Sequence, residues 1–142
     1  MRSRSLIAML ATTVLAATVL ATGCAATTQR SAATSLPAGV TTAMIAQGDS
    51  LFNAGSCQRC HGQKGVGAQN APSLVTGPWM HHRGSYDEIV ATVTAGIPRT
   101  ALKDTTRRFP MNPRGGPMNL TDAQVRDVAA YVWSISREKP AP

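Results

Sequence analysis

Five consecutive residues, Cys57-Gln58-Arg59-Cys60-His61, constrain this chain more than any other part of its sequence. Two cysteines separated by two residues and followed at once by a histidine form the attachment site of c-type haem. In that chemistry the two thiols add to the vinyl groups on one edge of a single haem, and the adjacent histidine ligates the iron. The motif therefore predicts one haem c, held covalently by Cys57 and Cys60 and ligated by His61.

Two other kinds of site also use a C-x-x-C pair. A thiol–disulfide redox pair is expected in a βαβ setting, which this sequence lacks. A structural zinc site needs a second Cys/His pair at suitable spacing, and the sequence offers only His81-His82 at an unusual distance. Haem attachment is therefore the favoured interpretation.

The segment 1–23 is expected to be a signal peptide. Arg2 and Arg4 precede an uncharged, mostly apolar run from Leu6 to Leu20, and this order is typical of a secretory signal. The run is shorter than the ~20 residues that cross the hydrocarbon core of a bilayer. An uncleaved membrane anchor is the alternative. The signal predicts an exported protein on the periplasmic side of a membrane.

The end of this signal resembles the lipobox of bacterial lipoproteins, in which a cysteine is acylated and becomes the new N-terminus. Gly23 stands directly before Cys24, although Ala21 occupies a position where leucine is usual. Ordinary cleavage near Gly23 is the alternative. We expect lipidation at Cys24, because two acyl chains anchor a protein stably to a membrane. Residues 24–41, rich in Ala, Thr and Ser, are expected to form a flexible tether.

Apolar residues recur at helical spacing in three segments of the remaining chain, so an all-α domain is expected over residues 42–138, followed by a tail at 139–142. The helices are expected at 42–53, 85–95 and 121–136. Capping boxes open the second helix at Ser85 and Glu88 and the third helix at Thr121 and Gln124. On the first helix, Gly48 suggests the close approach of another element.

Two long stretches rich in Gly and Pro, 62–84 and 97–119, separate the expected helices. Irregular segments of this length in a compact domain usually carry function or wrap around something large. Aromatic residues make up only 4% of the chain, so the expected core is modest. A covalent haem would supply the missing apolar bulk.

Together these features resemble the class I c-type cytochromes over essentially the whole domain. The matches occur along the chain in the same order as in that family. They are the C-x-x-C-H motif, the glycines and the Pro-x-Leu that follow it, the Gly/aromatic pair of the first helix, and the aromatic residue of the last helix. The matching residues are Cys57 to His61, Gly62, Gly65, Gly67, Pro72, Leu74, Gly48, Phe52 and Tyr131. The resemblance implies the class I cytochrome c fold, with three main helices around one covalent haem and the terminal helices crossing at Gly48.

The resemblance also implies roles for individual residues around the haem. Pro72 would offer its backbone carbonyl to the far nitrogen of the His61 ring, which fixes the tautomer of a ligating histidine. Leu74 would pack on the haem face. We further expect Trp79 to pack against the haem edge, with His81 and His82 beside it as solvent-facing loop residues.

The sixth iron ligand is expected to be Met111. It precedes the last helix at the distance that the axial methionine has in the family, and Met111 to Gly116 is similar to the M-P-P-x-G-G of the cytochrome c5-like branch. Asn112 departs from that pattern, because proline usually follows the methionine. The other candidates are Met44, Met80, His81, His82 and Met118. Met118 is the runner-up, His81 and His82 are further alternatives, and Met44 is interpreted as core filler.

A haem iron with two protein ligands favours a single-haem electron carrier rather than an enzyme. Its expected partners are redox proteins such as an oxidase, a dehydrogenase or a quinol-oxidising complex, and the chain is expected to be monomeric. The net charge of +7, to which Lys64, Arg83, Arg107, Arg108 and Arg114 contribute, favours acidic partners. Nucleic acid is not expected, because no basic run exists. The alternatives are a dedicated cytochrome subunit of a membrane oxidoreductase and a ligand-binding haem sensor or peroxidase-like protein.

Overall fold

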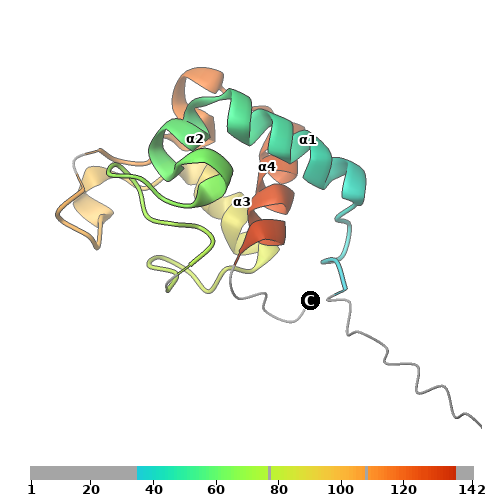
Figure 1. Ribbon diagram of the computed structural model, residues 1–142, viewed down its shortest axis with the longest axis horizontal. Coiled ribbons are helices and arrows are strands. Elements are labelled where there is room, and N and C mark those ends of the chain that lie inside the picture. Colours follow the sequence, from blue (N-terminus) through green and yellow to red (C-terminus); the bar gives the residue numbers. More distant parts are fainter. Residues whose placement is uncertain (1–34, 77, 108, 137–142) are drawn as a thin grey trace, which may run out of the picture. The chain divides into compact units, whose positions relative to one another are not determined.

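The computed structural model describes residues 35–76, 78–107 and 109–136, which all belong to one unit that begins at Ala33. Within these ranges the chain forms helices and one isolated β-bridge (Figure 1). The elements in chain order are α1 (Thr42–Ala54), α2 (Ser56–His61), η1 (Gln63–Gly65), α3 (Tyr86–Ala95), η2 (Arg99–Ala101), η3 (Pro113–Met118) and α4 (Asp122–Ile135), where η denotes a 3₁₀ helix. The segments 1–23 and 139–142, Cys24 and most of the expected tether lie outside the described residues.

The three longer helices begin where side-chain caps predict. Thr41 accepts a hydrogen bond from a backbone N–H in the first turn of α1. Ser85 and Glu88 form a complete capping box before α3, and Thr121 and Gln124 form another before α4. Each box satisfies backbone donors that the first turn of a helix leaves unpaired. Both predicted capping boxes are therefore confirmed.

The helix bounds differ from the expected ones by a single residue. Ser85 and Thr121 have extended backbone and are N-caps, and Ser136 is the C-cap of α4. α1 ends at Ala54 because Gly55, the next residue, leaves helical geometry. Capping residues contribute to a helix without adopting its backbone angles, so a sequence pattern readily counts them as helical.

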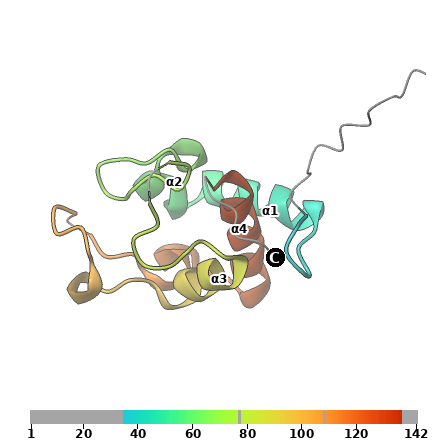
Figure 2. The ribbon, with the colours of Figure 1, turned by 90° about the horizontal axis from the view of Figure 1, so that it is seen from below.

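α1 and α4 pack against each other although they stand at opposite ends of the domain sequence (Figures 1 and 2). A Cβ atom on Gly48 would overlap with the backbone carbonyl of Asp127 and lie 2.8 Å from the Cβ of Tyr131. Phe52 lies one turn further along α1, and its ring centroid is 5.3 Å from that of Tyr131. The crossing predicted at Gly48 is therefore present, and only glycine fits there.

The hydrophobic core gathers on α4 and continues to α3 and Leu120. Leu120 and Val125, on either side of the start of α4, are both buried. The inner face of α3 contributes Ile89 and Val93. The buried residues of α4 are Val125, Val128, Ala129, Ala130, Tyr131, Val132 and Trp133.

Sequence periodicity does not indicate α2, the short helix that contains the whole C-x-x-C-H motif. It has six residues between Gly55 and Gly62, too few for an apolar stripe to repeat. The described residues of the stretches 62–84 and 97–119 are irregular apart from the 3₁₀ turns and the isolated bridge, as expected. Among the described residues, no helix has the length and apolar character needed to cross a bilayer.

Candidate haem-binding site

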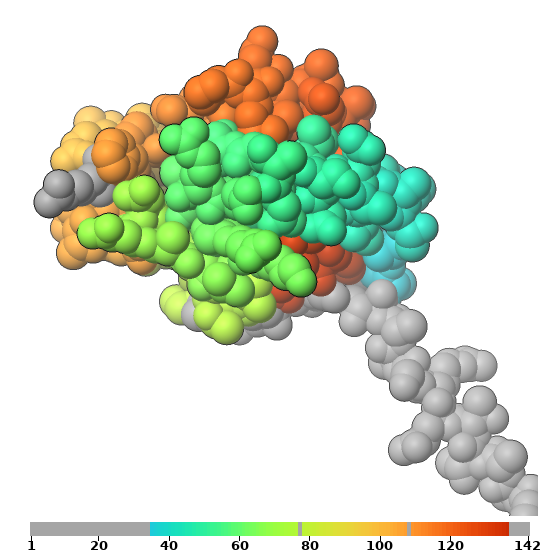
Figure 3. All heavy atoms as spheres, turned by 45° about the horizontal axis from the view of Figure 1, so that its top comes forward, coloured from blue at the N-terminus to red at the C-terminus, as the bar shows by residue number. Residues whose placement is uncertain are grey.

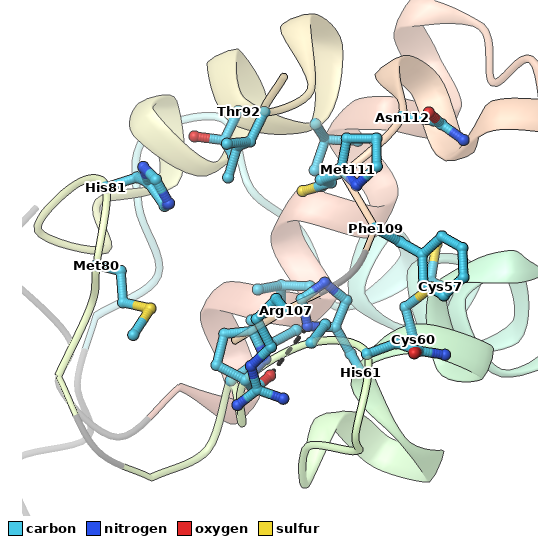
Figure 4. A pocket seen from close by; sticks show the side chains of 18 of the residues that line it. Cys57, Cys60, His61, Met80, His81, Thr92, Arg107, Phe109, Met111 and Asn112 are labelled. Carbon is cyan, nitrogen blue, oxygen red and sulfur yellow. Dashed lines mark hydrogen bonds between the residues drawn. The ribbon is translucent and has the colours of Figure 1, made fainter. Parts of the chain in front are cut away.

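A mostly apolar cleft of about 210 Å³ lies between α2, α3, α4 and the two irregular stretches (Figure 4). Large apolar clefts with a few polar groups are the usual form of cofactor sites. All residues that the sequence placed near the haem line this cleft: Cys57, Cys60, His61, Pro72, Leu74, Trp79 and Met111. The fold thus brings together side chains from separate segments of the chain.

Both cysteines of the motif are half-buried in α2 and are not joined in a disulfide. Burial raises the pKa of the Cys57 thiol, whereas thiol–disulfide catalysts lower the pKa of their reactive cysteine. Within the described ranges, no group of three or more His, Cys, Asp or Glu side chains is placed to hold a metal ion. Neither alternative to haem attachment therefore gains support from this geometry.

His61 is the last residue of α2, and its ring lines the cleft. Its Nδ1 lies 3.1 Å from the backbone carbonyl oxygen of Pro72, the contact that the family resemblance implies (Figure 4). A proton on Nδ1 that is donated to this carbonyl leaves Nε2 available to a metal. Burial lowers the pKa of His61. The ring is therefore favoured in the neutral form that metal binding requires.

Met111 lies across the cleft from His61 (Figure 4). Its backbone forms the isolated bridge with Ile97: Ile97 N donates to Met111 O at 2.8 Å, and Met111 N donates to Ile97 O at 3.0 Å. Ile97 follows Gly96, the C-cap of α3. We call the segment from Met111 to the start of α4 the methionine loop. The bridge therefore fixes the start of this loop to a packed helix.

The other methionines considered as ligands have different surroundings. Met118 does not line the cleft, and its Sδ accepts a hydrogen bond from the backbone N–H of Ser56 at 3.2 Å. Met44 also lies outside the lining and is half-buried on α1. Met80 lines the cleft beside His81 (Figure 4). Of Met111 and Met118, the two methionines in the methionine loop, only Met111 lines the cleft.

A comparison of the sequence with protein-family models matches cytochrome c over residues 45–136, more than half of the chain. The chain belongs to the cytochrome c family. The helical architecture agrees with the class I fold expected from the sequence. Family membership implies a covalently bound haem c, and Cys57 and Cys60 are the pair that attaches it.

The curated proteins that resemble this cytochrome c domain include subunits of cbb3-type cytochrome c oxidases. The chain is 36% identical over 85 residues to the cbb3-type cytochrome c oxidase subunit CcoP of Rhodobacter capsulatus, covering 56% of this chain and 27% of that protein. It is 35% identical over 98 residues to subunit FixPc of Rhizobium leguminosarum bv. viciae, covering 69% of this chain and 32% of that protein. The chain therefore spans only about a third or less of these relatives. No solved structure matches it significantly.

The residues of the cleft fit the haem c of this family. A thiol pair and an imidazole come from one short helix, a thioether faces them, and the remaining lining is largely apolar. Such a donor set suits an iron porphyrin joined by thioether bonds and ligated from both faces. Leu74 is buried in the core at the cleft wall, which is compatible with its expected contact with the haem face.

Trp79 and His82 lie against each other in the loop before α3, with ring centroids 4.6 Å apart. The expectation that His82 faces solvent is wrong. It is half-buried, lines the cleft, and accepts a hydrogen bond from Gly84 N at Nδ1 over 2.9 Å. Burial lowers the pKa of His82. His81 is exposed as expected, although it too reaches the cleft lining.

Arg107 contributes to the positive charge of the chain, and it also has a structural role that the sequence did not indicate. It lines the cleft, and its Nε donates to Asp104 Oδ2 at 2.8 Å. Its Nη1 donates to the backbone oxygens of Ala68 at 2.7 Å and Gln69 at 2.9 Å. Arg107 therefore ties the two irregular stretches together beside the cleft. A contact across almost forty residues leaves no local pattern in a sequence.

Proposed function

We propose that this cytochrome c domain is a one-electron carrier whose haem iron is ligated by His61 and Met111. The observation that supports this most strongly is the placement of the two side chains on opposite walls of one apolar cleft. Each is held by the backbone of a neighbouring segment, His61 by Pro72 and Met111 by Ile97. A methionine and histidine pair raises the reduction potential of haem iron.

The residues of the cleft hold and shield the haem rather than bind a substrate. The bound haem supplies one-electron chemistry by alternating between ferric and ferrous iron. His61 and Met111 would hold the iron between them, and an iron held by both side chains would leave no site for an exchangeable ligand. Leu74 and Trp79 contribute apolar surface that keeps water away from the ring. Electrons are then exchanged at whichever haem edge the protein leaves uncovered.

The charge of the chain supports docking to acidic redox partners. Of the five basic residues singled out from the sequence, Lys64 and Arg83 are exposed, whereas Arg107 and Arg114 form ion pairs with aspartates. Arg108 lies outside the described residues. Paired cations attract a partner less than unpaired ones, so we propose that Lys64 and Arg83 contribute more to steering than Arg107 and Arg114 do. Removal of the segment 1–23 with Arg2 and Arg4 leaves 12 basic and 7 acidic residues, a net charge of +5 that still favours acidic partners.

A dedicated cytochrome subunit of a membrane oxidoreductase is the second candidate. The similarity to subunits of cbb3-type oxidases favours it specifically. A subunit would remain in a complex after mild detergent extraction, whereas a monomeric carrier would separate. Purification of the chain from its native membrane, followed by identification of co-purifying proteins, distinguishes the two. Co-purification with an oxidase in stoichiometric amounts would show that the chain is a subunit and would contradict a free carrier.

We also propose that the domain works at the periplasmic side of a membrane, anchored by a lipid at Cys24. The basic residues and apolar run of the segment 1–23, with Gly23 before Cys24, support this assignment. Metabolic labelling with a fatty acid tests it. Label in the parent and none in a Cys24→Ser variant is the expected result, and an unlabelled parent protein would contradict lipidation.

The carrier proposal is tested by visible spectra of the purified holoprotein, oxidised and reduced, with and without carbon monoxide. An unchanged reduced spectrum after addition of the gas supports an iron with two protein ligands. A clear shift would show an accessible iron, and the sensor or peroxidase-like alternative would replace the carrier.

A further inference from the structure

Ser56 stands directly before the first haem-attaching cysteine and makes two contacts with η3, the segment that follows Met111. Its Oγ donates to Gly115 O at 2.5 Å, and its backbone N donates to Met118 Sδ at 3.2 Å. Both bonds are partly buried, and they join residues 59 and 62 positions apart. The start of α2 is therefore hydrogen-bonded directly to η3, which belongs to the methionine loop on the opposite wall of the cleft.

η3 needs such outside contacts because its own backbone is irregular. Arg114, Gly115 and Gly116 all have positive φ angles of 50°, 69° and 60°, so the segment lacks a continuous helical hydrogen-bond ladder. Arg114, near the start of η3, ties the segment to the beginning of α4: it donates from Nη1 to Leu120 O at 2.9 Å and from Nη2 to Asp122 at 2.7 Å. The bond from Ser56 holds the middle of the segment.

Gly55 permits the close approach of Met118 to α2. A Cβ atom at residue 55 would overlap with both Sδ and Cε of Met118. The sulfur thus reaches a backbone N–H in the first turn of α2, where no intrahelical acceptor exists. Sulfur is a weak acceptor, so we assign the larger share of the connection to the hydroxyl of Ser56.

Figure 3 shows the orange surface of the η3 region lying against the green surface of α2. The methionine loop is consequently held at two places, at Met111 itself by the backbone of Ile97 and at Gly115 by the side chain of Ser56. We infer that Ser56, assisted by Met118, is a positioning residue that keeps Met111 at the haem iron. This inference rests on the proposed ligation by His61 and Met111.

The test is the binding of imidazole to the ferric holoprotein, because imidazole must displace Met111 to reach the iron. Ser56→Ala leaves Gly115 O without its donor and loosens the loop. We expect imidazole to bind about 2- to 10-fold more tightly, the range that corresponds to the loss of one neutral hydrogen bond. Ser56→Thr keeps the hydroxyl and is expected to bind imidazole as the parent does.

A matched control separates positioning from general stability. Ser50→Ala removes a serine hydroxyl that donates to Ala46 O at 3.2 Å within α1. It is expected to leave imidazole affinity unchanged, with the thermal midpoints of all variants measured in parallel. The inference is overturned if Ser56→Ala binds imidazole like the parent, or if Ser50→Ala has an equal effect.

Met111→Ala distinguishes failure of this inference from failure of the proposed ligation. If it abolishes the near-infrared band of methionine-ligated ferric haem while Ser56→Ala has no effect on imidazole binding, only the positioning role is wrong. If Met111→Ala changes neither the band nor the imidazole affinity, the ligation and the positioning role both fail.

Discussion

Met111 is the residue whose replacement should change the electronic properties of the haem most directly. We expect Met111→Ala to lower the reduction potential by on the order of 0.1 V, because a thioether ligand favours ferrous iron and axial ligands span a range of ~0.8 V. A redox titration of the holoprotein measures this change. Met44→Ala is the control, since Met44 lies outside the cleft. An unchanged potential in Met111→Ala would contradict ligation of the iron by Met111.

Asp104 gives the loop beside the cleft an acid-sensitive contact. Its carboxylate accepts from the hydroxyl of Thr106 and from Arg107 Nε, and these bonds, the first in particular, lower its pKa below the ordinary value of 3.8. A lowered folded-state pKa stabilises the fold above the ordinary pKa, and this stability is lost as the pH falls through the folded value.

The resulting prediction concerns the difference in stability between the parent and Asp104→Asn. We expect the parent to be the more stable protein at pH 6, and the difference to shrink steadily as the pH falls below about 4. Urea unfolding of both proteins at several pH values measures it. A difference that stays constant down to pH 3 would contradict the ionic origin of the contact.

At the scale of elements, the crossing of α1 and α4 depends on the absence of a side chain at Gly48. Gly48→Ala would force the helices apart at the carbonyl of Asp127, and overpacking of this kind costs about 1–3 kcal/mol. Each kcal/mol lowers the melting temperature of a domain this size by about 4–8 °C. Thermal unfolding followed by circular dichroism checks this. Gln47→Ala, at an exposed neighbouring position, should leave the melting temperature nearly unchanged.

The elements that could be predicted from the sequence are those with local signals. α3 and α4 carry capping boxes and apolar stripes within a few turns, and the C-x-x-C-H motif is itself local. α2 was missed because six residues show no periodicity. The neighbours of Met118 and Arg107 were also missed, because their partners lie tens of residues away in the chain.

The residues of the candidate haem site could be predicted because they match motifs of a known family. Pro72, Leu74 and Met111 were named through the resemblance to a family, and the structure places them around one cleft. The predicted orientation of His82 was wrong because an irregular stretch has no periodicity that indicates which side chain turns inward. Its ring contact with Trp79 and its hydrogen bond from Gly84 are set by the folded loop.

At the scale of the whole molecule, the cleft replaces much of what would otherwise be a hydrophobic core. The core cluster borders the cleft through Phe52, Leu74 and Val128, and small domains bury too little surface to tolerate a large void. We therefore expect Cys57→Ala or His61→Ala to prevent stable haem attachment and to leave the chain largely unfolded.

Far-ultraviolet circular dichroism of the purified variants measures this outcome. Cys24→Ser is the matched control for loss of a thiol, because residue 24 precedes the cytochrome c domain, and it should keep the helical signal of the parent. A folded, helical protein without haem would show that the polypeptide core is sufficient by itself.

The double support of the methionine loop, from Ile97 at Met111 and from Ser56 at Gly115, also has a consequence for the rate of electron exchange. Gaining or losing an electron is slow when the atoms around the iron must rearrange. If Met111 ligates the iron as proposed, a loop held at these two places would keep the surroundings of the iron nearly the same in both oxidation states. The reorganisation energy would then be small, and the rate of transfer would be governed by the distance to the partner and the time spent docked.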